Sequence, residues 1–302
     1  MHSLGMDTSN YTTSVALYDG AQVVQKKRLL PVKPGELGLR QSDALFHHTA
    51  ALPGLLQEIL HGQSITAIAV SDKPRAVEGS YMPCFLAGVS AASAIASALG
   101  LPLKKYSHQQ GHLAAALYSC GRMDLLQSEF LAFHVSGGTT ECLLVHPGLH
   151  AQVIGGTADL NAGQLVDRVG VMLGFDFPAG AALDKLALAG AFSRKICVKT
   201  DGLTCHLSGL ENQCSQMHAQ ATAPADIARF CLESVAQAMI GIARAAIKQH
   251  GNLPLVFSGG VCCSEVLRAS ILAAFQQAQF AAPEFSADNA VGIAILAGED
   301  TM

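Results

Sequence analysis

Both halves of the chain begin with the same order of predicted elements: a strand, a hairpin and another strand, followed by alternating helices and strands. In the first half the hairpin turns at Asp19-Gly20, a dipeptide typical of tight turns between alternating apolar residues. This order predicts an α/β protein in which a mixed sheet flanked by helices is made twice. The predicted strands are residues 3–6, 13–17, 22–29, 65–70 and 101–106 in the first half, and 130–135, 141–145, 151–154 and 255–257 in the second.

The predicted helices divide the chain into two lobes. We expect the N-terminal lobe at residues 1–107, with the last helix, about 289–302, packing back on it, and the C-terminal lobe at residues 108–288. Residues 82–101 are apolar but rich in Ala, Ser and Gly, which favours a helix buried against a sheet over a membrane span. Residues 195–213 are predicted as a loop-rich insertion. The other predicted helices are residues 42–60, 161–173, 181–188, 225–250 and 289–298.

Composition limits the class of protein. The 302-residue chain has a formal net charge of −4, so bulk charge does not indicate a strongly basic nucleic-acid binder. Basic residues do cluster in two short segments, residues 26–28 and 104–105. The nine cysteines form no CxxC pair, which fits a reducing compartment and argues against a disulfide framework or a Cys-type zinc site. The N-terminus does not resemble a signal peptide, and we expect a cytoplasmic protein with no membrane partner.

Three turns after predicted strands combine hydroxyl residues with glycine or aspartate. Such turns present backbone N–H groups to an anion, and glycine lets a ligand approach the backbone closely. Each turn alone is also compatible with an ordinary hairpin or turn, but the three together favour a ligand-binding protein. The turns are Asp7-Thr8-Ser9, Ser136-Gly137-Gly138-Thr139 and Ser258-Gly259-Gly260.

Two histidines, His108 and His112, are spaced to share a metal ion if the segment is helical, because residues four apart lie on one helix face. A third ligand would come from elsewhere, and Asp288, just before the last predicted helix, is a suitable carboxylate. The alternative is two unrelated surface histidines. Asp167 and Asp184 flank a Pro/Gly turn that ends at Gly180, and they are either ligands for hydroxyl groups or solvated helix carboxylates.

The motifs, taken in order, resemble the TsaD/YgjD/Gcp family nearly from end to end. Members of this family were long labelled O-sialoglycoprotein endopeptidases (peptidase M22) and are understood as tRNA threonylcarbamoyladenosine transferases. The segment LGMDTSNYTTSVAL is similar to the family's LGIETSCDETAVAI, and YSHQQGHLAAAL is similar to NHLEGHLLA. The other similar segments are HVSGGTTECLLV, GQLVDRVGVMLGFDFPAG, LSGL, FSGGVCCSEVLR and SADNAVGIAILAG.

The resemblance implies an actin-like ATPase superfold, with two similar lobes around a central cleft. It implies that His108, His112 and Asp288 bind one divalent metal ion, iron or zinc. It also implies ATP, AMP or threonylcarbamoyl-adenylate as the ligand. The residues expected to contact that ligand are Asp7, Thr8, Ser9, Ser136, Gly137, Gly138, Thr139, Asp167, Gly180, Asp184, Gly259, Gly260 and Ser264.

The chain departs from the family pattern at several positions. Thr139 replaces the His of the family's SGGHT turn, Ser264 replaces the Asn of GGVAAN, and the GPGL turn is absent. These differences indicate a divergent paralogue that keeps the fold and the metal residues.

The expected activity is the metal-dependent transfer of a threonylcarbamoyl group from its adenylate to the N6 amine of a tRNA adenosine next to the anticodon. The expected partners are tRNA, a small homologous protein and an ATPase of the same pathway. The alternatives are a non-catalytic paralogue that binds a nucleotide or a partner, a metallopeptidase as in the historical label, and a sugar-kinase-like activity on the same superfold. No side chain is assigned as a general base.

Overall fold

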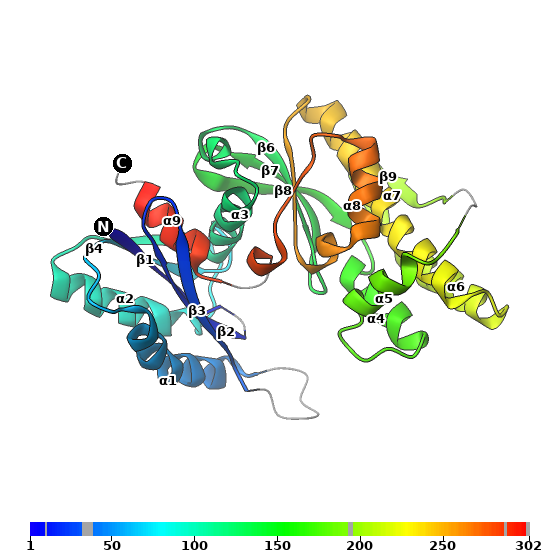
Figure 1. Cartoon of the computed structure of the whole chain (residues 1–302). Coiled ribbons are helices and arrows are strands. Elements are labelled where there is room, and N and C mark those ends of the chain that lie inside the picture. Colours follow the sequence, from blue (N-terminus) through cyan, green and yellow to red (C-terminus); the bar gives the residue numbers. More distant parts are fainter. Residues whose placement is uncertain (10, 32–38, 193–195, 287–288, 300–302) are drawn as a thin grey trace. The chain divides into compact units, whose positions relative to one another are not determined.

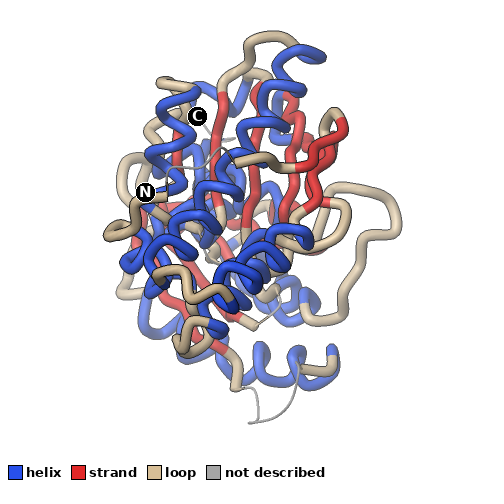
Figure 2. The backbone as a smooth tube through the Cα atoms, turned by 90° about the vertical axis from the view of Figure 1, so that its right-hand side faces the viewer, coloured by secondary structure: helices blue, strands red, loops and turns tan. Residues whose placement is uncertain are grey.

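The computed structural model describes residues 1–9, 11–31, 39–192, 196–286 and 289–299, and the chain forms two compact units. The first unit contains Met1–Leu126 and Ala287–Met302, and the second contains Gln127–Ser286. Each unit has one mixed sheet with helices packed against it (Figures 1 and 2). The predicted α/β class, with a hairpin at the start of each half, is confirmed.

The sheet of the first unit has the strand order β3-β2-β1-β4-β5. Its first strand, β1, pairs antiparallel with β2 and parallel with β4. The predicted Asp19-Gly20 turn joins β2 to β3, and the Asp19 carboxylate accepts hydrogen bonds from the amides of Ala21 and Gln22 at 2.8 and 2.7 Å. The strands are β1 (His2–Asp7), β2 (Thr12–Tyr18), β3 (Val23–Leu29), β4 (Ile65–Lys73) and β5 (Leu103–Ser107).

Helices cover both faces of this sheet. Successive residues of a strand point to opposite faces, so alternate residues of one strand pack against different helices. In β4, Ile68 and Val70 belong to a core formed with α1 and α2, whereas Ala67 and Ala69 pack with α9. The helices of the unit are α1 (Gln41–Ile59), α2 (Phe85–Leu99), α3 (His108–Ser119) and α9 (Val291–Glu299).

Glycine allows α9 to lie very close to both β1 and α3. A Cβ atom at Gly5 would be 2.3 Å from the amide nitrogen of Ala294, and one at Gly292 would be 1.8 Å from the carbonyl oxygen of Gly111. These contacts hold α3 in the first unit. The lobe boundary that we expected after residue 107 therefore lies earlier than the boundary in the structure, which falls between Leu126 and Gln127.

The second unit has a seven-stranded sheet in the order β12-β11-β6-β7-β8-β10-β9. Its core includes a stack of rings on three neighbouring strands: Phe133 lies 4.6 Å from Phe257, and Phe257 lies 5.1 Å from Phe280, between ring centroids. The strands are β6 (Phe130–Val135), β7 (Thr140–His146), β8 (His150–Thr157), β9 (Lys199–Asp201), β10 (Thr204–His206), β11 (Leu255–Ser258) and β12 (Gln279–Phe280). The helices are α4 (Ala162–Met172), α5 (Gly180–Ala187), α6 (Ser208–Ala219), α7 (Pro224–His250) and α8 (Glu265–Ala274).

Among the described residues, α7 is the single helix long and apolar enough to cross a membrane. Its most apolar window is 67% buried inside the protein, as expected for a core helix of the second unit. The apolar segment that we predicted as a buried helix, residues 82–101, contains α2, whose Ala87, Ala92 and Ala96 are buried in a core with the first sheet.

The prediction of a loop-rich insertion at residues 195–213 is wrong for most of its described part. That part contains β9 and β10, which pair with each other, and the start of α6. The strands are only three residues long, too short to show the period-two pattern that identifies a strand. β10 also pairs with β8, which lies some fifty residues earlier in the chain. This long-range pairing cannot be read from the local sequence.

The close contact between α9 and α3 can be tested with Gly292→Ala. We expect the free energy of unfolding to fall by about 1–3 kcal/mol, because the new methyl group overlaps the Gly111 carbonyl and the helices must move apart. Gly54→Ala, inside α1, is the matched control, since the nearest atoms to its Cβ belong to the flexible Arg28 guanidinium at 3.9 and 4.0 Å. Thermal and urea unfolding measure both variants. Equal stability of Gly292→Ala and the wild type would contradict the packing described here.

Candidate functional site

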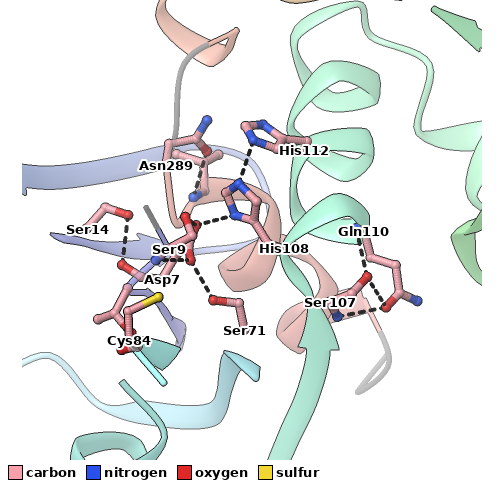
Figure 3. A network of polar contacts seen from close by, with 12 residues as sticks. Asp7, Ser9, Ser14, Ser71, Cys84, Ser107, His108, Gln110, His112 and Asn289 are labelled. Carbon is pink, nitrogen blue, oxygen red and sulfur yellow. Dashed lines mark hydrogen bonds and ion pairs between the residues drawn. The ribbon is translucent and has the colours of Figure 1, made fainter. Parts of the chain in front are cut away.

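Asp7 is the centre of a buried polar network in the first unit (Figure 3). It is the last residue of β1, and it is 0% exposed. Its Oδ1 accepts hydrogen bonds from the Ser71 hydroxyl at 2.6 Å and from the Ser9 amide at 3.1 Å. Its Oδ2 accepts from the Ser9 hydroxyl at 3.1 Å and lies 2.7 Å from Nδ1 of His108. The network therefore joins the ends of β1 and β4 to the first residue of α3.

The position of His108 is determined by the cap of α3. The Ser107 hydroxyl accepts a hydrogen bond from the Gln110 amide at 3.2 Å, and the Gln110 side-chain oxygen accepts from the Ser107 amide at 2.9 Å. This reciprocal capping box satisfies two amides that a helix start otherwise leaves without intrahelical partners. The helix therefore begins at His108, and His112 lies one turn later on the same face.

The two imidazoles meet through their Nε2 atoms, which are 2.9 Å apart. Two convergent imidazole nitrogens suit zinc or iron, so the donor chemistry fits the predicted metal. Asp288, the predicted third ligand, lies outside the described residues. Its neighbour Asn289 is drawn beside the two histidines in Figure 3. Within the residues described, no group of three or more His, Cys, Asp or Glu side chains is arranged to hold a metal ion.

Two residues expected to contact the nucleotide, Thr8 and Ser9, are buried and form hydrogen bonds within the protein. The Thr8 hydroxyl donates to the carbonyl oxygen of Cys84 at 3.1 Å and accepts from the amide of Gly88 at 3.2 Å. It therefore ties the end of β1 to the start of α2. The Ser9 hydroxyl donates to Asp7. Ser9 therefore belongs to the Asp7 network, whereas the Thr8 side chain holds α2.

In the second unit, the Ser136-Gly137-Gly138-Thr139 segment forms the turn between β6 and β7. The Ser136 amide donates to the Thr139 carbonyl oxygen at 2.7 Å, and the Thr139 amide donates to the Ser136 hydroxyl at 3.1 Å. The start of α4 packs directly below the turn, because Gly163 has no side chain: its Cβ would be 2.5 Å from the Gly137 amide nitrogen. A Cβ at Gly137 would meet no atom within 4 Å.

A pocket of about 630 Å³ opens beside this turn. Its volume is typical of small-molecule sites. It brings together residues from four separate segments of the second unit that the sequence singled out, whereas Ser136, Gly138, Thr139 and Gly259 are not part of its lining. The predicted residues that line the pocket are Gly137, Asp167, Gly180, Asp184, Gly260 and Ser264.

The sequence did not identify several residues of the pocket. Leu188, the C-cap of α5, comes four residues after Asp184, and this helical spacing offered a signal. Lys185 directly follows Asp184, and its spacing offered none. Leu232 comes from α7, and no local pattern distinguishes it from the other buried residues of that helix. The remaining unpredicted lining residues include Val166, Pro178, Val261, Cys263 and Glu265.

Asp167 and Asp184, the two carboxylates of the pocket that the sequence singled out, are held by hydrogen bonds from the protein. Asp184 accepts hydrogen bonds from the hydroxyl of Ser264 and from the amides of Glu265 and Val266, at 2.8 and 3.4 Å for the amides. It therefore binds the N-terminus of α8, where a negative charge is favourable. Asp167 accepts from the amide of Ala179 at 2.8 Å, which holds the turn before α5.

Asp159 connects the end of β8 to the start of α6, near the pocket-lining helix α4. It accepts hydrogen bonds from the amides of Leu160 and Leu207 at 2.7 and 2.8 Å, and from the hydroxyl and amide of Ser208. Burial acts to raise the pKa of Asp159. The hydrogen bonds from the Ser208 hydroxyl and the three amides outweigh burial and lower the pKa to about 2.

A family model and individual relatives, compared with this chain, carry the same description. A family model described as "TsaD: tRNA N6-adenosine threonylcarbamoyltransferase" matches residues 34–295. The chain is 31% identical over 268 residues to the tRNA N6-adenosine threonylcarbamoyltransferase of Streptococcus suis strain 05ZYH33, covering 83% of this chain and 77% of the relative. It is 30% identical over 324 residues to the protein of that name from Granulibacter bethesdensis, covering 96% and 86%.

Solved structures show the fold. Component A of the (R)-2-hydroxyglutaryl-CoA dehydratase of Acidaminococcus fermentans aligns with 99% of this chain and 98% of its own, with a TM-score of 0.58 and 15% sequence identity. At that identity the likeness concerns the fold alone. It confirms the actin-like ATPase superfold that the sequence resemblance implied.

Asp159 predicts a pH-dependent contribution to stability. Its pKa is lower in the folded protein than the roughly 3.9 of an unfolded chain, so the ionised form stabilises the fold above that value. The contribution is lost as the pH falls through about 2. We expect Asp159→Asn to lower the free energy of unfolding by on the order of 1 kcal/mol at pH 7, after discounting for partial exposure to solvent.

The measurement is urea unfolding of both proteins between pH 7 and pH 2, where the difference should shrink toward the acid end. Asp176→Asn, at an exposed position, is the matched control and should follow the wild type. A stability difference that does not change with pH would contradict the role assigned to the Asp159 charge.

Proposed function

Because the chain belongs to the TsaD family, described as tRNA N6-adenosine threonylcarbamoyltransferase, we propose that it transfers a threonylcarbamoyl group to the N6 amine of a tRNA adenosine next to the anticodon. The donor in this proposal is threonylcarbamoyl-adenylate. The reaction forms a bond between the adenosine N6 and the carbamoyl carbon, and it breaks the bond from that carbon to the phosphate oxygen. AMP leaves with the electron pair, and N6 loses one proton.

The observation that carries the proposal is the convergence of predicted ligand residues on one pocket of about 630 Å³. Val166, Leu188 and Leu232 supply apolar walls that suit a purine ring. The carboxylates of Asp167 and Asp184 line the same pocket and suit the hydroxyl groups of a ribose. Gly137 has no side chain at the point where its turn borders the pocket, which suits close approach of a phosphate to backbone amides.

The glycine turn would stabilise the leaving phosphate. Backbone N–H groups that are already oriented stabilise negative charge without reorganisation during the reaction. The turn is held by the hydrogen bonds between Ser136 and Thr139 and by the packing of Gly163, so its geometry is set before a ligand binds. No described side chain is assigned as a general base for the N6 proton.

We propose that His108 and His112, together with Asp288, hold one iron or zinc ion. When bound, such an ion supplies a Lewis acid that polarises or orients a carbonyl oxygen. The two facing Nε2 atoms support this assignment. The chain's own contribution at this place is a pair of imidazoles positioned by a capped helix and by Asp7.

The partners in this proposal are tRNA, a small homologous protein and an ATPase of the same pathway, and the location is the cytoplasm. The basic residues of β3 are partly neutralised, because Lys26 and Arg28 lie 4.0 and 3.3 Å from the carboxylate of Glu58. Contacts to phosphate dominate affinity for nucleic acids, and other residues or a partner would add to those of β3 in this proposal.

The direct test is to incubate the purified protein with unmodified tRNA and threonylcarbamoyl-adenylate, and to measure modified adenosine by mass spectrometry of digested tRNA. We expect modification with the wild type and at least a hundredfold less with the His108→Ala, His112→Ala double variant, which should also lose its bound metal. Nucleotide binding without modified tRNA, also after addition of the pathway's partner proteins, would favour a non-catalytic paralogue. Full activity of the double variant would refute the metal role.

The pocket is tested by comparing two neighbouring glycines. Gly137 lines the pocket and Gly138 does not, and a Cβ at either would meet no protein atom within 4 Å. We expect Gly137→Val to weaken AMP binding at least tenfold, because its side chain projects into the ligand's space. Gly138→Val should change binding much less. Calorimetric titration of AMP measures both, with thermal unfolding to check the fold. Equal affinities for Gly137→Val and the wild type would place the nucleotide elsewhere.

A further inference from the structure

We infer that Asp7 is a positioning residue that fixes the tautomer of His108 and so makes its Nε2 atom available to a metal ion. The sequence suggested that Asp7 contacts the nucleotide, but its side chain is 1% exposed and both of its oxygens accept hydrogen bonds from protein groups. The inference rests on the metal site of the proposed function. It concerns a residue that is not among the three predicted metal ligands, His108, His112 and Asp288.

The direction of the hydrogen bond follows from the chemistry of the two groups. An ionised carboxylate only accepts hydrogen bonds, and a neutral imidazole has one nitrogen that donates and one that accepts. With Asp7 Oδ2 at 2.7 Å, Nδ1 of His108 carries the proton. The lone pair is therefore on Nε2, which faces Nε2 of His112 at 2.9 Å. Carboxylate, imidazole and metal arranged in this way form a frequent unit of metal sites.

The carboxylate cannot turn away from His108. Ser71 holds its Oδ1 from β4, and the Ser9 amide holds the same oxygen from the chain just after β1. The Ser9 amide is an obligatory donor, whereas a hydroxyl such as that of Ser71 can reverse its direction. An oxygen must therefore occupy the Oδ1 position in any variant that keeps this backbone.

This constraint makes Asp7→Asn informative. The amide oxygen of the asparagine must take the Oδ1 position, next to the Ser9 amide, so its NH₂ group takes the Oδ2 position and faces His108. Nδ1 of His108 then becomes an acceptor, and the proton moves to Nε2. The variant has nearly the same shape as the wild type, but the nitrogen that faces His112 no longer has a lone pair for a metal.

The test uses the metal-free full-length protein labelled with ¹⁵N-histidine, and the signals of His108 are assigned by comparison with His108→Gln. We expect the wild type to carry the proton on Nδ1 and Asp7→Asn to carry it on Nε2. We expect the affinity for Zn²⁺, measured by competition with a chromophoric chelator, to fall about 10–100-fold in Asp7→Asn. Ser14→Ala is the matched control, because the Ser14 hydroxyl bonds the main-chain carbonyl of Asp7 and not its carboxylate.

The outcomes separate this inference from the proposed function, since neither readout needs nucleotide or tRNA. A wild-type His108 with its proton on Nε2 overturns the inference, and this result does not depend on whether any variant folds. Unchanged tautomer and unchanged Zn²⁺ affinity in Asp7→Asn overturn it as well. The expected tautomers and affinities with no modified tRNA would leave the inference standing and refute the proposed activity.

Discussion

The close packing of α9 against β1 and α3 is the constraint on which the first unit depends. It joins the two ends of the chain, because Gly5 lies under Ala294, and it places Gly292 against Gly111. A side chain at Gly5 would push α9 away from β1, and one at Gly292 would push α9 away from α3. The same contacts bring Asn289, just before α9, next to the histidines of α3 (Figure 3). The candidate metal site therefore follows from backbone packing as much as from its polar residues.

Three carboxylates have a common task in the two units: they accept hydrogen bonds from backbone amides and hydroxyls at places where elements meet. Asp7 joins two strand ends to α3, Asp159 joins β8 to α6, and Asp184 joins α5 to α8. Each satisfies amides that would otherwise lack partners at a strand end or helix start. These residues order the loops around the candidate sites, and that order reduces the reorganisation needed when a ligand binds.

The parts of the fold that local sequence determines could be predicted. The β2–β3 hairpin follows from alternating apolar residues and Asp19-Gly20, and the pairing of His108 with His112 follows from their spacing on a helix. Long-range contacts could not be predicted in the same way. Ser71 reaches Asp7 from a strand some sixty residues away, and Leu232 reaches the pocket from the middle of α7. The lobe boundary was misplaced for the same reason, since Gly111 and Gly292 meet only in the folded unit.

Ser264 determines how the pocket meets the N-terminus of α8. Its hydroxyl accepts a hydrogen bond from the Leu267 amide at 3.1 Å and donates to Asp184. The N-terminus of α8 thus already has a side-chain cap and a carboxylate, so its favourable interaction with negative charge is satisfied within the protein. A phosphate placed there would be repelled by Asp184. In the proposed ligand the phosphate is therefore expected at the glycine turn of Gly137, and the neutral ribose and base beside α8.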